Sequence, residues 1–307
     1  ILDYADKWYD LPAGWYVVEG NVTITPRLDT HGAVNLILTN GSHLTAEWGI
    51  DVKVGDTFTV YAQSTDEGTM GRLTACLPAD FNLDRMVHYS VWPYSGMAGI
   101  GSSARWRAGN DGIRESEGTI VINGGNIRAK GQDSASAIGG PLDSEIEFRY
   151  TVRGEVYNRR QGGSITINGG TVKASSDGDG FGIGGAGVHH TAEMHITING
   201  GNIETTANRN NAAIGDKSKQ KSSVTITDGV IHAVGKGSAA GIGSTGDIRI
   251  TGGEISAFAE GGGAAIGSIG GVDCKSITIN GNAIKSISSK DGTCIGAATG
   301  GSVGSIT

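Results

Sequence analysis

One stretch of the sequence recurs along the second half of the chain, and this repeat constrains the fold more than any other feature. The stretch Thr119–Gly139 reads TIVINGGNIRAKGQDSASAIG, and its pattern returns five more times. The later copies begin at Ser164, His195, Ser223, Asp247 and Ser276. A unit repeated in this way buries its apolar face by stacking on its neighbours. The repeat therefore predicts a solenoid.

Each copy contains three short apolar segments at fixed spacing. In the first copy Ile120 and Ile122 lie two residues apart, which places both side chains on one face of a strand. A second strand begins at Ile127, and an isoleucine followed by glycine marks a third strand. The isoleucines of this third strand are Ile138, Ile183, Ile214, Ile242, Ile266 and Ile295. Each copy is therefore predicted to form one rung, meaning one full coil of the solenoid.

The turn between the first two strands favours an all-β interpretation. It reads Asn-Gly-Gly or a close variant, and these residues tolerate the positive φ of a sharp turn. No copy has helical periodicity. We predict a single right-handed parallel β-helix with three short strands per rung, and we take the handedness from the preference of parallel crossovers. Residues 1–117 are expected to form an N-terminal cap and irregular rungs, and residues 118–307 regular repeats of the same continuous domain.

Most of the length variation falls between the third strand of one copy and the first strand of the next. Loop insertions are therefore predicted mainly at one corner of the solenoid. Insertions on one face of a solenoid often mark the face that meets a partner. Neutral drift at a tolerant corner explains the same pattern equally well.

Aromatic side chains concentrate in the insertions within residues 76–163. Aromatic rings beside charged groups can form a sugar-binding surface, and they can equally form small satellite cores that hold long loops in place. The candidate ligand-binding residues are Tyr89, Trp92, Tyr94, Trp106, Phe148, Tyr150, Tyr157 and Arg149.

Carboxylates in the same insertions suggest a catalytic alternative. A pair of carboxylates can act as general acid and base on a glycosidic bond. The candidates are Asp111, Glu115, Asp143, Glu145 and Glu193, with His189 or His190 assisting. Any acidic β-helix offers such pairs, so the pattern alone does not establish catalysis.

The sequence predicts no metal site and no cofactor. Asp177-Gly178-Asp179-Gly180 resembles part of a calcium loop, but the full EF-hand pattern is missing, so a polar turn is the simpler interpretation and structural calcium the alternative. The three cysteines lack zinc-ligand spacing. Cys274 and Cys294 are expected near the same rim, either as a disulfide or as free thiols.

Two further features are expected to be structural. Asn123, Asn168, Asn199 and Asn280 recur at the first turn and should hydrogen-bond one another and the backbone. The neighbours of the third-strand isoleucines are glycine or alanine, so that face is nearly bare backbone. Either a loop covers this face or a flat polymer approaches it.

Charge and termini narrow the possible partners. The net charge is −7, and no cluster of Lys and Arg along the sequence suggests nucleic acid. No apolar run reaches the roughly 18 residues of a membrane span. The chain starts at Ile1, and its last residues resemble the first strand of another copy. We therefore expect a fragment of a longer protein with further domains.

The repeat INGGxIxAxG…AAIGG follows a segment that reads GWYVVEGNVTI…LILTNGSHLTA. Together they resemble the β-helix regions of large secreted or cell-wall proteins of Gram-positive, often gut-dwelling, bacteria. The resemblance covers most of the chain and implies an extracellular location, secreted or attached to the cell wall. Such regions occur in adhesins, carbohydrate-binding proteins and glycan-active enzymes, so the resemblance is specific for fold and weak for function.

We therefore predict an extracellular surface module that binds polysaccharide or host glycan through the insertions. One alternative is a glycoside hydrolase or polysaccharide lyase, and another is an adhesin stalk that contacts host protein. Thr166, Thr197, Thr225 and Thr278 occupy outward positions of the first strand where β-helix lyases and hydrolases usually place acids. These threonines argue against a pectin-type active site there.

Overall fold

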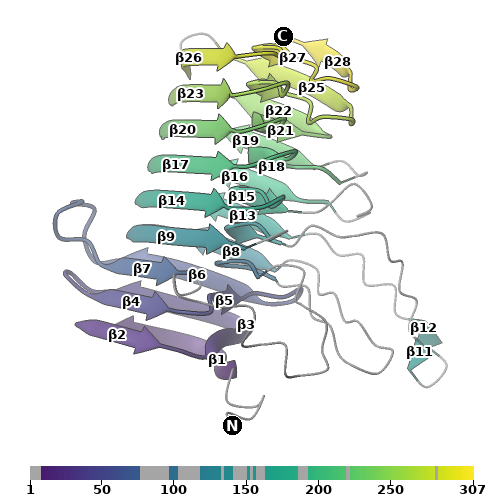
Figure 1. The fold of residues 1–307 in the computed structure, drawn as a ribbon. Helices are drawn as coiled ribbons and strands as arrows, with labels where there is room; N and C mark the ends of the chain where they lie inside the picture. The colour runs from purple at the N-terminus through teal and green to yellow at the C-terminus, as the bar shows by residue number, and fades with distance from the viewer. Residues whose placement is uncertain are drawn as a thin grey trace.

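The computed structural model shows an elongated all-β solenoid (Figure 1). The structure describes residues 8–76, 97–102, 118–132, 135–140, 163–185, 193–218, 222–280 and 283–307, together with the strands at 151–152 and 155–156. The described residues contain no α-helix, and so none that is long and apolar enough to cross a membrane.

Three parallel sheets run along the solenoid, and the chain visits them in turn. The first sheet has 11 strands, in which parallel pairing joins each rung to the next. Its strands are β1 (Trp8–Val18), β3 (Arg27–Leu38), β6 (Thr57–Ala62), β8 (Thr119–Ile122), β13 (Ser164–Ile167), β16 (His195–Ile198), β19 (Ser223–Ile226), β22 (Asp247–Ile250), β25 (Cys274–Ile279) and β28 (Val303–Ile306), with β5 (Ile50–Asp51) paired to β3.

The second sheet has nine strands and the third has six. The second contains β2 (Asn21–Ile24), β4 (His43–Ala46), β7 (Arg72–Ala75), β9 (Asn126–Gly131), β14 (Thr171–Ser176), β17 (Asn202–Ala207), β20 (Val230–Gly235), β23 (Glu254–Ala259) and β26 (Ile284–Ser289). The third contains β10 (Ile138–Gly139), β15 (Ile183–Gly185), β18 (Ala212–Asp216), β21 (Ala240–Ser244), β24 (Ile266–Gly267) and β27 (Ile295–Gly296). A separate antiparallel hairpin joins β11 (Thr151–Val152) to β12 (Glu155–Val156).

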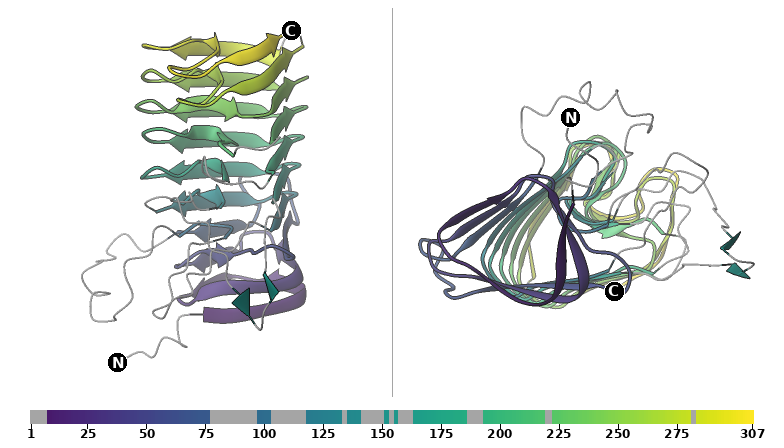
Figure 2. Two further views of the ribbon diagram at one scale, coloured as in Figure 1. Left: turned by 90° about the vertical axis from the view of Figure 1, so that its right-hand side faces the viewer. Right: turned by 90° about the horizontal axis from the view of Figure 1, so that it is seen from below.

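The predicted repeat register is confirmed. Ile165 pairs with Ile120 on one side and Ile196 on the other, and the third-strand isoleucines pair in the same way from Ile138 to Ile295. Seen along the axis, the strands of successive rungs superimpose around a common interior (Figure 2). Nearly all inward side chains are fully buried, which supplies the hydrophobic free energy that no single rung could gain alone.

In most regular rungs the glycine after the third-strand isoleucine lies against the backbone of the next rung. Gly139, Gly184 and Gly215 have φ values of +127°, +141° and +158°. A Cβ atom at any of these positions would lie 1.7–1.9 Å from the carbonyl oxygen of the next glycine in the column. The Ile-Gly pair is therefore a requirement of backbone contact between rungs as well as of core packing.

The early rungs differ from the regular ones in strand organisation. β1 and β3 have 11 and 12 residues, and each continues as one strand through both the third-sheet and the first-sheet positions, with a register shift between Pro12 and Gly14. Residues 8–14 form part of strand β1, which pairs with β3 at the N-terminal end of the first sheet. Pairing of β6 with β8 and of β7 with β9 joins the early rungs to the regular ones, so the sheets cross the predicted boundary at residue 117.

Strand β26 departs from the register that the repeat predicts. Its register shifts, so Ile287 pairs with Ala257, where the repeat spacing had placed Ser286.

A second cluster of buried residues bears on the nearly bare third face. Outside the third sheet, Phe181, Ala212, Ala240 and Ile269 form a second buried cluster with Val272 packed against it. The chain thus covers part of this face itself, which favours the covering loop over an approaching polymer.

The asparagines at the first turn form the expected ladder over part of its length. Asn168 donates from Nδ2 to Asn123 Oδ1 at 2.7 Å, and Asn199 donates to Asn168 Oδ1 at 2.9 Å. Thr227 then donates to Asn199 Oδ1 at 2.9 Å. The side chain of Asn280 contributes no hydrogen bond to a described residue, so the ladder ends before that rung.

Candidate functional site

Most of the site residues predicted from sequence lie outside the described residues. They are Tyr89, Trp92, Tyr94, Trp106, Asp111, Glu115, Asp143, Glu145, Phe148, Arg149, Tyr150 and Tyr157, and the assisting His189 and His190 join them. The aromatic insertions of residues 76–163 therefore remain a prediction. Glu193 is the one predicted site residue whose surroundings the structure describes.

Glu193 lies on the surface beside the first sheet, next to a histidine. Its Oε2 atom is 3.5 Å from His195 Nε2, and His195 Nδ1 is 2.9 Å from Ser223 Oγ. Both Glu193 and His195 have side chains that are 50% exposed. The described partners of Glu193 are thus an imidazole and, through it, the hydroxyl group of Ser223.

The acidic turn at Asp177–Gly180 is occupied by cationic partners. Asp177 pairs with Lys130 at 2.7 Å, and Asp179 pairs with Arg209 at 3.2 Å. Burial lowers the pKa of Lys217, and the charge of Asp179 opposes that shift, so a third cation lies nearby. A calcium ion would have to compete with these cations. The surroundings of both carboxylates favour the polar turn.

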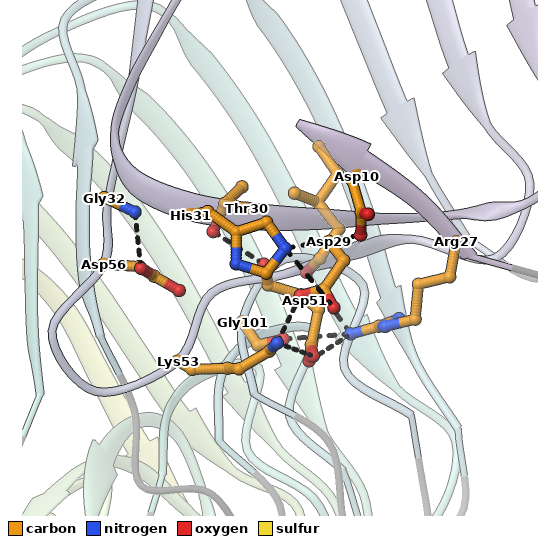
Figure 3. A network of polar contacts seen from close by, with 11 residues as sticks. Asp10, Arg27, Asp29, Thr30, His31, Gly32, Asp51, Lys53, Asp56 and Gly101 are labelled. Atoms are coloured by element: carbon orange, nitrogen blue, oxygen red, sulfur yellow. Dashed lines mark hydrogen bonds and ion pairs between the residues drawn. The ribbon is translucent and has the colours of Figure 1, made fainter. Parts of the chain in front are cut away.

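A buried polar network lies in the early rungs, around Arg27 (Figure 3). Arg27 is 1% exposed, and its guanidinium donates to the carbonyl oxygens of Trp48, Ala98, Ile50 and Gly101 and to Asp51 Oδ1. At this level the described residues continue the line of the third sheet only through the short strand β5, which pairs with β3, and through isolated bridges from Ile50 to Ile100 and from Ile100 to Ile138. Arg27 therefore holds together backbone groups that a regular ladder would pair, which is a structural role.

The outer edge of this network contains the described group best placed to bind a metal ion. One ligand atom from each of Asp10, Asp29 and His31 lies within 4.8 Å of the others. His31 Nε2 is 3.3 Å from Asp10 Oδ1, and Asp29 Oδ1 is 2.5 Å from Lys53 Nζ (Figure 3). The Lys53 ammonium already supplies positive charge at Asp29, so the arrangement is satisfied as an ion-pair network.

An exposed aromatic pair lies on the outer face of the first sheet in the early rungs. Trp15 is 64% exposed, and its ring stacks on Tyr61 with centroids 5.4 Å apart and planes inclined by 30°. Trp15 belongs to β1 and Tyr61 to β6, so the pair bridges the intervening strand β3. Val17 beside them is 57% exposed. We call Trp15, Tyr61 and Val17 the aromatic platform.

The platform stands at the head of a row of polar side chains. Trp15 pairs in register with Asn35, and Asn35 pairs with Thr59. The Asn35 side chain is partly exposed and makes no hydrogen bond with a described residue. Thr59 points outward but is only 7% exposed, so neighbouring side chains cover it. An aromatic face beside an unused amide is suited to a ligand that has both C–H faces and hydroxyl groups.

The sequence contained a signal for this platform outside the insertions. Successive side chains of a strand point to opposite faces, so in GWYVVE and TFTVYA Trp15 and Tyr61 fall on the face opposite the buried Val18 and Val60. The missing information was the register between these two strands, which are separated by 46 positions in sequence and by one strand in space.

The three cysteines have free thiols. Cys274 is buried and Cys294 is exposed, and burial raises the pKa of the Cys274 thiol to about 11. A thiol with a raised pKa is a poor nucleophile at neutral pH, so Cys274 is best described as a packing residue.

Comparison of the chain with protein-family models, curated proteins and solved structures finds no match. Functional inference therefore depends on the geometry of the described residues.

Proposed function

We propose that this chain is an extracellular surface module that binds glycan, and that the aromatic platform is a principal contact. The observation that carries the proposal is the exposure of Trp15 on a rigid strand, held in place by stacking on Tyr61. A tryptophan fixed in this way offers a large contact area and loses little conformational freedom on binding. One open face of the indole can stack on the C–H face of a pyranose ring.

The polar surroundings of the platform favour a glycan over a protein partner. Asn35 offers an amide donor and acceptor next to the ring, and the same register continues to Thr166 and Thr197 further along the sheet. Sugar hydroxyls need such two-way partners, because each hydroxyl both donates and accepts. A stalk that contacts host protein remains the alternative, and the exposed Val17 is the feature that favours it.

Two further predictions belong to this proposal, one about the insertions and one about the handedness of the coil. The aromatic insertions of residues 76–163 would add contacts beside the platform. The coil is taken as right-handed, in line with the preference of parallel crossovers.

Replacement of Trp15 by alanine tests the proposal. The purified chain would be applied to immobilised mucin, plant and microbial glycans, and we expect retention on at least one of them. Trp15→Ala should weaken that binding by roughly tenfold or more, which corresponds to about 1.4 kcal/mol. Val230→Ala is the matched control, because Val230 is 49% exposed on the second sheet, away from the platform.

The proposal fails if no glycan is retained, or if Trp15→Ala binds as well as the unaltered chain. Far-ultraviolet circular dichroism and the thermal transition would show that both variants fold. A protein partner would appear as binding to glycoprotein that survives enzymatic removal of its glycans.

The catalytic alternative has a direct test at its one described residue. Incubation with the same glycans, followed by an assay for new reducing ends and released oligosaccharides, should detect no turnover by a binding module. Release that disappears in Glu193→Gln would instead support a hydrolase centred on Glu193 and His195.

A further inference from the structure

We propose that the ligand is a neutral, linear and extended polysaccharide that lies parallel to the solenoid axis along one row of the first sheet. This inference rests on the proposed function and specifies the ligand of the same face. The row starts at Trp15 and ends at Thr225, and we call it the axial row. Its members are Trp15, Asn35, Thr59, Val121, Thr166, Thr197 and Thr225.

Register alone makes the axial row straight. Each member pairs directly with the next one across the parallel sheet, from β1 through β3, β6, β8, β13 and β16 to β19. Successive strands of a sheet lie about 4.8 Å apart, so the six intervals span roughly 29 Å. An extended sugar chain advances by a similar distance per residue, and one residue can therefore lie over each strand. A helical or strongly branched glycan cannot follow such a row.

The hydroxyl groups in the second half of the row are available to a ligand. Thr166, Thr197 and Thr225 point outward, are partly exposed and make no side-chain hydrogen bond with a described residue. The neighbouring row at the turn behaves differently, because Asn123, Asn168 and Asn199 bond to one another. On this part of the face, the threonine hydroxyl groups of the axial row are therefore available to a ligand, whereas the asparagine side chains already bond mainly to one another.

The axial row is uncharged over its whole length, and this argues for a neutral polymer. The next position after Thr225 in the register is Arg249, whose exposed guanidinium forms no ion pair with a described residue. An acidic polysaccharide would require cations repeated along the row to balance its charges. The row offers one cation at its far end, so it favours neutral sugars over uronates or sulfated sugars.

The length dependence of binding tests the inference. Titration calorimetry would use neutral β-linked gluco-, xylo-, manno- and N-acetylglucosamine oligosaccharides of increasing length. We expect affinity for one of these series to rise with each added sugar and to level off at about seven residues, the number of strands in the row. Affinity that stops rising at two residues would overturn the axial row but leave the platform, and thus the proposed function, intact.

Single variants separate the two halves of the row. Thr197→Val removes a hydroxyl with little change in shape, so we expect about a three- to tenfold loss of affinity for a hexasaccharide and no change for a disaccharide bound at Trp15. Thr206→Val, on the outer face of the second sheet, should change neither value. Equal hexasaccharide binding by Thr197→Val and the unaltered chain would overturn the inference. Tighter, salt-sensitive binding of an acidic polymer would overturn the neutrality of the ligand.

Discussion

The early rungs and the regular rungs solve the same stacking problem with different chemistry. In the regular rungs the residue after each third-strand isoleucine is glycine, and at Gly139, Gly184, Gly215 and Gly267 adjacent rungs meet backbone to backbone. In the early rungs the corresponding column contains Asp10, Asp29 and Asp51, which pair in register. None of these aspartates has the positive φ of the glycines.

Carboxylates stacked one strand apart repel each other, so the early rungs need compensating cations. Arg27 and Lys53 supply them, through contacts of 3.4 Å to Asp51 and 2.5 Å to Asp29. A solenoid rung therefore tolerates an irregular strand where a buried guanidinium donates hydrogen bonds to backbone carbonyl groups. Regular rungs avoid this need through close backbone contact. The aromatic platform lies in the irregular half.

The largest expected effect comes from breaking the backbone contact of the regular rungs. In Gly184→Ala the new Cβ would lie 1.7 Å from the Gly215 carbonyl oxygen, at a φ of +141° that L-residues rarely adopt. We expect a loss of more than about 5 kcal/mol in the free energy of unfolding, beyond the usual range for single substitutions. Urea denaturation followed by circular dichroism would measure it.

Gly169→Ala is the matched control for that variant. A Cβ at Gly169 would lie 3.4 Å from the Asn123 carbonyl oxygen, which is close to ordinary contact, and its φ is not positive. This substitution should cost less than about 1 kcal/mol. Similar losses of unfolding free energy in the two variants would show that close backbone contact at Gly184 does not determine the cost of the substitution.

The regular half of the fold could be predicted from sequence because each rung repeats the same local choices. Alternation placed Ile165 and Ile167 inward, and the constant spacing fixed the register of all three sheets. The fold of the early rungs could be predicted from the sequence only in part. Nothing in the sequence of β1 and β3 indicated that one strand would continue through two sheet positions. The role of Arg27 depends on carbonyl groups up to 74 positions away.

The candidate site was less predictable than the fold for the same reason. The sequence analysis favoured aromatic residues that are close in sequence, such as Trp92 and Tyr94, which lie outside the described residues. Trp15 and Tyr61 become neighbours only through strand pairing. The alternation gave the direction of each side chain, but contact between them required the register of irregular rungs.

The second largest effect is expected from the early rungs, in the variant Arg27→Met. Loss of the guanidinium removes the Arg27 donor from Asp51 and from the carbonyls of Ala98 and Gly101. Removal of one partner from a buried charge pair costs about 3–5 kcal/mol. Because solenoid rungs interact mainly with their neighbours, the loss should be local. Hydrogen exchange should accelerate in β3 and β5 far more than in β20 and β23.

Lys285→Met tests whether burial is the cause. Lys285 pairs with Glu254 on the second sheet, and its side chain is 62% exposed, so its loss should cost no more than about 1 kcal/mol. Uniform acceleration of exchange along the whole chain in Arg27→Met would contradict the local role of Arg27, and so would a cost as small as that of Lys285→Met.

The smallest effect concerns a feature of the regular rungs alone, the asparagine ladder. Asn168→Ala removes two side-chain hydrogen bonds, to Asn123 and from Asn199, at an exposed turn. Each bond contributes about 0.5–1.5 kcal/mol when buried and less in water, so we expect a total loss of about 1 kcal/mol in urea denaturation. Asn280→Ala is the control, since the Asn280 side chain bonds to no described residue and should change stability by less than about 0.5 kcal/mol. Equal losses of stability at the two positions would mean that asparagine stabilises the conformation of the turn and that the hydrogen bonds between rungs contribute little.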